Sequence, residues 1–228
     1  MKVKILQNKG KFEILAIMPE KPLELIEIAG RVSYESQDKI EAGSAEKFVK
    51  KLRERGHESV LEHSSMTVFF SNVSRGFTHE TVRHRIASFT QKSTRYVRDS
   101  IFKVIAPPDK DVDEELVTLR INKKNRKISF KISFRQWIDL NRQMYHGLIK
   151  AGWAKQDARQ VLPIGIEAPI VVTANFREWR HIFELRCSKA AHWEIRRVML
   201  DLLIEVQKRV PVVFDDFEIH SDFAEKPS

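Results

Sequence analysis

The sequence predicts an α+β fold, with a mainly antiparallel sheet packed by long helices in a single domain over residues 1–228. Stretches with the period of a strand and stretches with the period of a helix both occur along the chain. They do not alternate regularly, as a doubly wound parallel sheet would require. The sequence also has no internal repeat and no low-complexity segment, which fits one compact core.

The first half of the chain predicts strands and helices in short succession. Alternating or continuous β-favouring residues mark the strands, and an apolar stripe after a proline or a serine cap marks the helices. Strands are expected over 2–7 and 12–18, as an N-terminal pair, and over 65–72; helices are expected from Pro22, over 44–55 with Ser44 as N-cap, and over 76–85.

The second half predicts a hairpin followed by most of the helical residues. Residues 117–121 and 128–132 alternate at period two around a basic turn, which is a hairpin signal. Trp137, Leu140, Met144 and Leu148 follow helical spacing up to Gly152. Further helices are expected over 155–162, 177–185 and 190–209, with a strand over 169–174.

The amino-acid composition is that of a globular protein without disulfides or membrane spans. The chain has 42% hydrophobic and 31% charged residues, an ordinary balance for a globular enzyme. The N-terminus lacks the apolar core of a signal peptide, and no run approaches the ~18 apolar residues of a membrane span. The single Cys187 excludes an internal disulfide and a multi-cysteine zinc site. We therefore expect a cytoplasmic protein that does not use a membrane.

The net charge of +9 indicates anionic partners, such as phosphorylated metabolites or nucleic acid. The densest polar stretch runs from Arg83 to Tyr96 and holds three arginines, a histidine, an amide and several hydroxyls. Arginine forks beside hydroxyls suit a phosphate or pyrophosphate, so we interpret this stretch as an anion site. The alternative is a salt-bridged surface loop.

The same stretch resembles the signature of the flavin-dependent thymidylate synthases. Arg83-His84-Arg85, seven further residues and then Ser93 match the pattern RHR-x7-S. Other blocks that resemble the family in order are 29–34, 56–63, 159–163, 175–177 and 185–196. The resemblance covers roughly residues 29–200, and the hairpin over 117–132 looks like an insertion peripheral to it.

The resemblance implies a reaction and a set of partners. It implies reductive methylation of dUMP to dTMP, with methylenetetrahydrofolate as one-carbon donor and NADPH-reduced FAD as hydride donor. The catalytic residue is then Arg186, which favours the ionised uracil, and no cysteine acts as nucleophile. A homotetramer with shared active sites is also implied, with neither nucleic acid nor a membrane as partner.

Site residues are carried over from the matching motifs. The resemblance implies dUMP contacts from Glu80, Arg83, Gln91, Lys92, Ser93, Thr94, Arg95, Arg159 and Arg186. It implies FAD contacts from Ser33, His57, Ser59, Arg83, His84, Arg85, Gln91, Asn175, Arg177 and His181. The sequence departs from some members at Thr90, Gln91, Lys92 and His181, where we expect altered contacts without loss of function.

The residues also allow other interpretations. His57-Glu58 with Glu62-His63 could form a metal cluster, but no third ligand is indicated, so we expect no metal. Cys187 lies among apolar helix positions and is expected to be an inert thiol. The rival functions are a nucleic-acid-binding protein, a flavoprotein reductase without methyl transfer, and an inactive paralogue.

Overall fold

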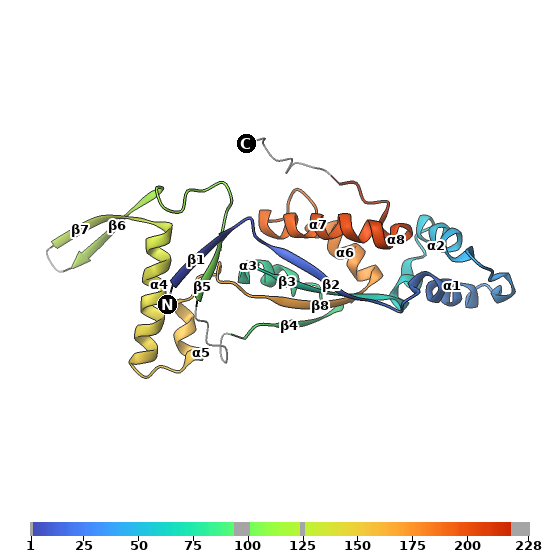
Figure 1. Cartoon of the computed structure of the whole chain (residues 1–228), viewed down its shortest axis with the longest axis horizontal. Coiled ribbons are helices and arrows are strands. Elements are labelled where there is room, and N and C mark those ends of the chain that lie inside the picture. Colours follow the sequence, from blue (N-terminus) through green and yellow to red (C-terminus); the bar gives the residue numbers. More distant parts are fainter. Residues whose placement is uncertain (1, 94–100, 124–125, 220–228) are drawn as a thin grey trace. The chain divides into compact units, whose positions relative to one another are not determined.

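The computed structural model describes residues 2–93, 101–123 and 126–219 (Figure 1). The chain forms two compact units: unit 1 comprises 1–9, 72–78 and 91–169, and unit 2 comprises 10–71, 79–90 and 170–228. Each unit is assembled from stretches that alternate along the chain, so no single cut in the sequence separates them. The single domain over 1–228 remains a prediction.

Unit 2 is built on a four-stranded sheet. Its order is β2 (Lys11–Met18), β3 (Ser65–Ser71), β8 (Ile170–Asn175) and β4 (Ala87–Gln91). The β2–β3 and β3–β8 pairs are antiparallel, with Val68 opposite both Ile14 and Val172. With 17-residue helices in the same chain, this sheet confirms the α+β class and its mainly antiparallel character.

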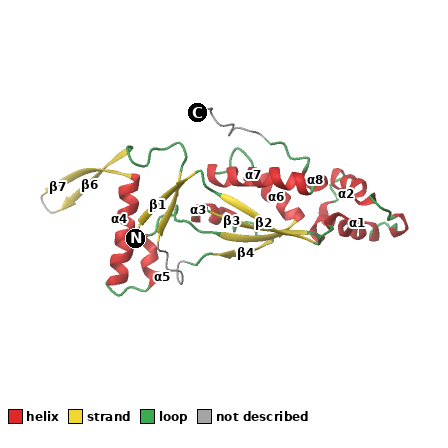
Figure 2. Ribbon diagram, in the orientation of Figure 1, coloured by secondary structure: helices red, strands yellow, loops and turns green. Residues whose placement is uncertain are grey.

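One face of this sheet forms the core of unit 2. Met66, Val68 and Phe70 on β3 are fully buried, whereas the alternate residues of the strand are only half-buried. Helices α6 (Phe176–Arg186) and α7 (Trp193–Arg209) lie over this face (Figure 2). Trp179 of α6 donates its indole N–H to the carbonyl oxygen of Met66 at 2.9 Å, which ties the helix to the strand beneath it. The period-two pattern of the strand thus sets which side receives the helices.

The remaining helices of unit 2 are shorter. They are α1 (Pro22–Val32), α2 (Ser44–Glu54), α8 (Pro211–Phe214) and the 3-10 turns η1 (Gln37–Lys39) and η2 (Glu58–His63). Gly30 lets α1 approach α2, because a Cβ at this position would lie 2.7 Å from the Phe48 ring. Ser44 is not the N-cap that we expected: Gly43 takes that place, and the Ser44 hydroxyl donates to the buried Glu27.

Unit 1 contains a parallel strand pair, β1 (Lys2–Gln7) with β5 (Ile101–Ala106). Phe102 and Val104 of β5 pack against Ile138 of α4 (Phe134–Lys150) to form its core. The expectation that 2–7 and 12–18 pair with each other was therefore wrong. The boundary between the units falls between these two strands, so β1 joins β5 and β2 joins β3.

The hairpin and the helix after it form where the sequence predicts them. β6 (Leu116–Lys123) and β7 (Arg126–Ser133) are antiparallel, as expected for 117–132. Helix α4 begins directly after β7 because Ser133 and Gln136 form a capping box. The helix expected over 155–162 is instead a single turn, α5 (Lys155–Ala158), followed by the 3-10 turn η3 (Arg159–Val161).

Two helix boundaries and two strands also differ from the prediction. Helix α3 (Arg75–Thr81) ends four residues before the expected 85, and α7 begins at Trp193 instead of 190. Strands β4 and β5 were not predicted. After the α3 helix ends at Thr81, the chain turns and His84 is buried. No helix within the described part of the chain is long and apolar enough to cross a membrane.

Candidate functional site

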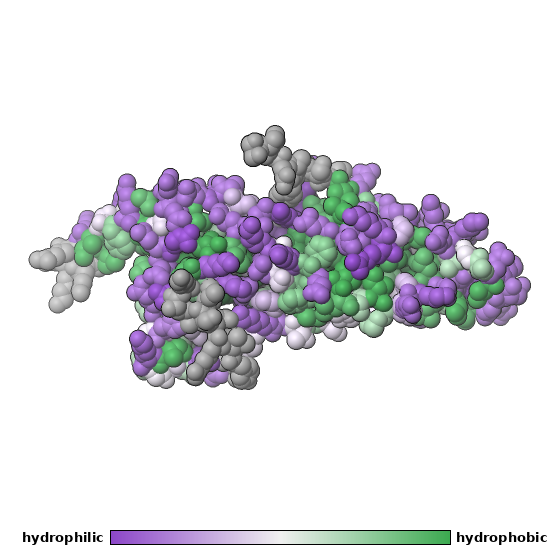
Figure 3. All heavy atoms as spheres, viewed as in Figure 1, coloured by the Kyte–Doolittle hydropathy of each residue, from purple (hydrophilic) through white to green (hydrophobic). Residues whose placement is uncertain are grey.

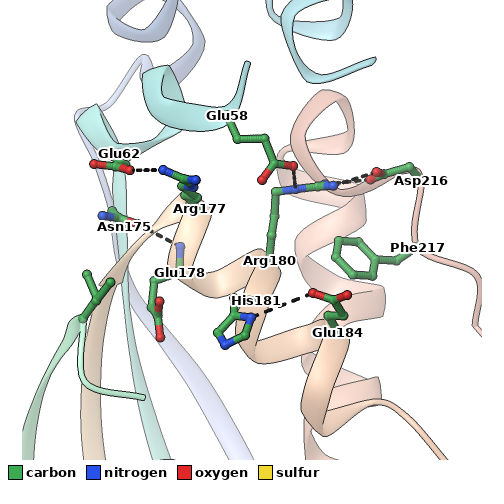
Figure 4. Close-up of a pocket in the computed structure, with 11 residues that line it drawn as sticks. Glu58, Glu62, Asn175, Arg177, Glu178, Arg180, His181, Glu184, Asp216 and Phe217 are labelled. Carbon is green, nitrogen blue, oxygen red and sulfur yellow. Dashed lines mark hydrogen bonds and ion pairs between the residues drawn. The ribbon is translucent and has the colours of Figure 1, made fainter. Parts of the chain in front are cut away.

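A cavity of about 730 Å³ opens in unit 2 beside the first turns of α6 (Figure 4). It lies where the β8 strand ends and α6 begins, opposite η2 and the residues that follow α8. Such a volume suits a ligand of the size of a nucleotide. Its lining residues are Glu58, Glu62, Ile86, Asn175, Arg177, Glu178, Arg180, His181, Glu184, Asp216 and Phe217.

Local sequence explains why α6 presents these groups. Asn175 caps the helix, and its side-chain oxygen accepts from the backbone N–H of Glu178 at 2.8 Å. From this start, Arg177, His181 and Glu184 follow at helical spacing and line the same cavity. The buried Trp179 anchors the opposite side of the helix in the core. The α6 helix therefore positions most of the polar groups of the site.

The two arginines of the cavity are already paired with carboxylates. Arg177 contacts Glu62 at 2.6 Å, and Arg180 contacts Glu58 at 3.0 Å and Asp216 at 2.7 Å. Burial by itself would lower the pKa of Arg180, but Asp216 and Glu58 together raise it above its ordinary value. Five carboxylates and two guanidiniums line the cavity, so its wall is acidic despite the basic net charge of the chain.

Beside this cavity, His84 is held in a buried network. Its Nδ1 lies 3.4 Å from a carboxylate oxygen of Glu178, and its ring meets His181 edge-on at 5.6 Å. Burial, then Arg186 and then His181 lower the pKa of His84 to about 4. Burial also raises the pKa of Glu178 above its ordinary value. At neutral pH the contact of His84 with Glu178 is therefore one between a neutral imidazole and a carboxyl group, not an ion pair.

Arg186, the expected catalytic residue, is fixed by three hydrogen bonds. Its Nε donates to Nε2 of His84 at 3.0 Å. One terminal nitrogen donates to the Glu80 carboxylate and the other to the Glu80 carbonyl oxygen, both at 3.0 Å. A guanidinium has five N–H donors, so two remain for a ligand. The structure thus brings together Glu80, His84 and Arg186, three of the predicted residues.

The remaining predicted residues of unit 2 are spread along its surface. Arg83 and Arg85 are exposed in the turn that leads to Ile86, which lines the cavity. His57 is exposed, and its Nδ1 lies 2.9 Å from the Tyr34 hydroxyl. Ser33 and Ser59 are also exposed, and like His57 they do not line the cavity.

The other predicted residues belong to unit 1. Gln91 accepts from Arg75 at 3.3 Å and donates to the Thr78 hydroxyl. Lys92 lies 3.7 Å from the buried Glu167, which Lys103 contacts at 3.0 Å. Burial, and then the neighbouring charge of Arg159, lower the pKa of Arg75. The charge of Arg159 thus acts on Arg75, and two guanidiniums that influence each other favour an anionic ligand.

The last expectations concern Ser93, Thr94, Arg95, Cys187 and a metal ion. Ser93 is half-buried, whereas Thr94 and Arg95 lie outside the described residues. Burial raises the pKa of Cys187 to about 12, which agrees with the expected inert thiol. Among the residues with described positions, no group of three or more His, Cys, Asp or Glu side chains could hold a metal ion.

Sequence reasoning missed much of the cavity wall. Glu58 and Glu62 lie in the 56–63 block that resembles the family. Beside His57 and His63 they suggested a metal cluster and not the wall of a cavity. Arg180 and Glu184 follow Arg177 at i+3 and i+7, so helical spacing could have identified them. Asp216 and Phe217 lie far along the chain and carried no signal.

Known proteins resemble the chain over most of its length. The family model described as thymidylate synthase complementing protein matches residues 13–212. A flavin-dependent thymidylate synthase of Mycolicibacterium vanbaalenii is 38% identical over 212 residues, covering 86% of this chain and 79% of the relative. One of Corynebacterium glutamicum is 36% identical over 203 residues, covering 86% and 80%.

The fold also has a counterpart among solved structures. The UMP/dUMP methylase PolB from Streptomyces cacaoi, bound with 5-Br dUMP, superposes with a TM-score of 0.70. The match covers 93% of this chain and 95% of that one at 23% sequence identity. At this identity the likeness supports the fold.

Proposed function

This chain belongs to the flavin-dependent thymidylate synthase family, and on that premise we propose that it methylates dUMP to dTMP. The proposed reaction takes the one-carbon unit from methylenetetrahydrofolate and its hydride from FAD reduced by NADPH. The enzyme is then a methyltransferase that needs no cysteine nucleophile. Cys187 agrees with this, because a thiol whose pKa is about 12 is almost entirely protonated at neutral pH.

The arrangement of Arg186 carries the proposal. Its guanidinium is held on one side by His84 and on the other by Glu80, with an 18% exposed side chain. A fixed cation that keeps two N–H donors free can stabilise negative charge on a pyrimidine ring without exchanging a proton. Because its position is set before the ligand arrives, little reorganisation opposes the reaction.

The residues of the cavity fit an FAD molecule. Asn175, Arg177 and His181 offer an amide, a guanidinium and an imidazole, and Phe217 offers an aromatic face. The exposed Arg83 and Arg85 would hold the pyrophosphate, because the cavity wall itself is acidic. When bound, the reduced flavin supplies the hydride that ends at C6 of uracil. Ser33, His57 and Ser59 remain proposed flavin contacts.

The dUMP contacts are proposed residue by residue from the family signature. In unit 1 they are Gln91, Lys92, the half-buried Ser93 and Arg159. In unit 2 they are Glu80, Arg83 and Arg186. Thr94 and Arg95 are proposed from the family signature alone. We also propose a homotetramer, on the same family grounds.

One experiment tests the proposal directly. The purified protein is first examined for flavin absorbance and reduced anaerobically with NADPH, and then dUMP and methylenetetrahydrofolate are added. We expect the flavin bands to bleach with NADPH and to return as dTMP forms. The Arg186→Ala variant should keep its flavin and lose dTMP formation. A protein that takes up no FAD and binds no dUMP would overturn the assignment, and flavin reduction without dTMP would favour the reductase alternative.

A further inference from the structure

We call residues 215–217, which follow α8, the wall segment, because Asp216 and Phe217 line the cavity of unit 2 (Figure 4). The segment belongs to no helix or strand. Its backbone is held from α7, where Gln207 donates to the carbonyl oxygens of Phe214 and Phe217, both at 3.0 Å. Figure 3 shows hydrophilic (purple) and hydrophobic (green) side chains side by side over α7 and α8, so both kinds of contact are available to hold the segment.

A row of alternating charges connects the wall segment with α2, α6 and η2. The Arg53 side chain of α2 is 6% exposed, and its Nη1 pairs with Asp215 and lies 3.3 Å from a carboxylate oxygen of Asp216. The Asp216 carboxylate accepts two hydrogen bonds from Arg180, both at 2.7 Å, and Arg180 contacts Glu58 at 3.0 Å. Figure 4 shows Arg180 between Glu58 and Asp216. Arg53 therefore contacts the wall segment from outside, without lining the cavity itself.

Burying the Arg53 charge is unfavourable by itself. Its Nε is buried and has no hydrogen-bond partner among the residues that the structure describes. An unmet buried donor destabilises a fold, and exchanging buried ion pairs for apolar side chains of similar volume is often neutral or stabilising. The inner face of α2 is otherwise formed by apolar residues such as Val49 and Leu52. We therefore attribute the guanidinium at this position to its hold on the wall segment and not to the stability of the core.

Arg53 also offsets the acidic wall of the cavity. Five carboxylates and two guanidiniums line the cavity, and Arg53 adds a further cation behind Asp216. Burial would raise the pKa of Asp216, but the hydrogen bond and the charge of Arg180, and then the charge of Arg53, lower it below its ordinary value. Asp216 is thus a carboxylate at neutral pH that attracts both cations. Without Arg53 the wall would repel an anionic ligand more strongly.

We propose that Arg53 is a positioning residue of the flavin site, which holds Asp215 and Asp216 so that the wall segment stays closed on bound FAD. This inference rests on the proposed function, because it takes FAD as the occupant of the cavity. Arg53 acts through Asp216, which fixes Arg180, and the Arg180 guanidinium lies 4.9 Å from the centre of the Phe217 ring. Without Arg53 the wall segment loses its anchor on α2 and opens more often, so FAD dissociates faster and is more open to solvent.

The first test exchanges the guanidinium for an apolar side chain in Arg53→Met. Asp215 and Asp216 are 43% and 39% exposed, so water can solvate both carboxylates in this variant, and circular dichroism verifies that it is folded. We expect the FAD dissociation constant to rise by about 10-fold, and the quenching of bound-flavin fluorescence by acrylamide to increase by about 2-fold. Arg53→Lys keeps a cation and should bring the FAD dissociation constant to within about 3-fold of the parent value.

The matched control is Arg55→Met, which removes the same charge from an exposed residue of the same part of the chain. Its FAD dissociation constant should stay within about 2-fold of the parent value, because an exposed charge acts weakly through water. Equal dissociation constants in Arg53→Met and Arg55→Met would overturn the positioning role of Arg53. A parent chain that takes up no FAD would overturn the proposed function, and the hold of Arg53 on the wall segment would then be decided without cofactor.

That second measurement is proteolysis of the full chain by chymotrypsin, which cleaves after aromatic residues. Cleavage after Phe217, mapped by mass spectrometry, should be about 10-fold faster in Arg53→Met than in the parent chain and unchanged in Arg55→Met, because it follows the opening of the wall segment. Asp215→Asn should also speed this cleavage, and in the Arg53→Met background it should add less than about 2-fold, since the two residues act as one pair. Independent effects of the two substitutions, or equal cleavage in the parent and Arg53→Met, would refute the hold of Arg53 on the wall segment.

Discussion

Arg186 donates its Nε–H to Nε2 of His84 at 3.0 Å, across 102 positions of sequence. An imidazole nitrogen that accepts a hydrogen bond carries no proton, so the proton of His84 sits on Nδ1, toward Glu178. The pKa of about 4 keeps His84 neutral at physiological pH. His84 is therefore a positioning residue for the guanidinium, and this relationship underlies the first two predictions.

Replacing Arg186 with lysine should abolish most activity without loss of flavin. A lysine ammonium cannot donate to His84 and to both oxygens of Glu80 in the same geometry, because it lacks the planar fork. We expect kcat/KM for dTMP formation to fall by about 100-fold or more, the scale of removing a fixed electrostatic donor. Steady-state kinetics on flavin-loaded enzyme measure this. The control is Arg209→Lys, at an exposed ion pair with Glu205, and its kcat/KM should equal that of the parent chain. An equal loss of kcat/KM in both variants would contradict the role of Arg186.

Acidification should release Arg186 from His84. Because the folded-state pKa of His84 is lowered from 6.5 to about 4, the unfolded chain binds this proton first as pH falls. The contribution of His84 to stability is thus fully present above about pH 6.5, decreases between 6.5 and 4, and levels off below 4. The free energy of unfolding, measured with urea between pH 7.5 and 4.5, should decrease as the pH falls. The decrease should be smaller in the His84→Asn variant. An NMR titration that places the pKa of His84 near 6.5 would refute the neutral imidazole.

The sequence predicted the parts of this site that are local, and it missed those that arise from distant pairing. The helical spacing of Arg177 and His181 and the alternation of β3 can be read from neighbouring residues. By contrast, the pairing of β1 with β5 joins residues about a hundred positions apart, and nothing in either strand specifies its partner. The acidic wall was also missed, because Asp216 reaches the cavity through the core packing of α8.

Removing acidic charge from the cavity should tighten flavin binding, whereas removing basic charge should weaken it. Glu184 is an exposed carboxylate on the cavity wall, and one of its oxygens lies 3.8 Å from Nδ1 of His181. Glu184→Gln lowers repulsion of an anionic cofactor, so we expect the FAD dissociation constant to fall by about 2- to 5-fold. Arg177→Gln should raise it by a similar or larger factor. Flavin fluorescence titration at low salt measures the FAD dissociation constant of both variants. Dissociation constants that change in the same direction would contradict the electrostatic interpretation.

The Arg180 ion pairs should matter for stability. Arg180 is 12% exposed, donates to Glu58, Asp216 and the carbonyl oxygen of Val213, and lies 4.9 Å from the Phe217 ring. Arg180→Ala removes the donor to Glu58 and to the Val213 carbonyl oxygen, while Asp216 keeps its contact with Arg53 at 3.3 Å. The loss should lower the free energy of unfolding by about 2 kcal/mol. Lys21→Ala, which removes the exposed pair with Glu24, is the control and should cost at most about 0.5 kcal/mol. Urea unfolding measures both, and equal effects would show that Arg180 is no more than a surface cation.

Cys187 should be dispensable for catalysis. Burial raises the pKa of its thiol to about 12, so that about one molecule in 10⁴ carries a thiolate at pH 8. We therefore expect Cys187→Ala to retain kcat within about 2-fold, with a stability cost of about 1 kcal/mol for the lost sulfur. In the parent chain the thiol should react with a disulfide reagent slowly when folded and at the ordinary rate in urea. Loss of dTMP formation in a folded, flavin-loaded Cys187→Ala protein would instead place this thiol in the reaction and contradict the proposed chemistry.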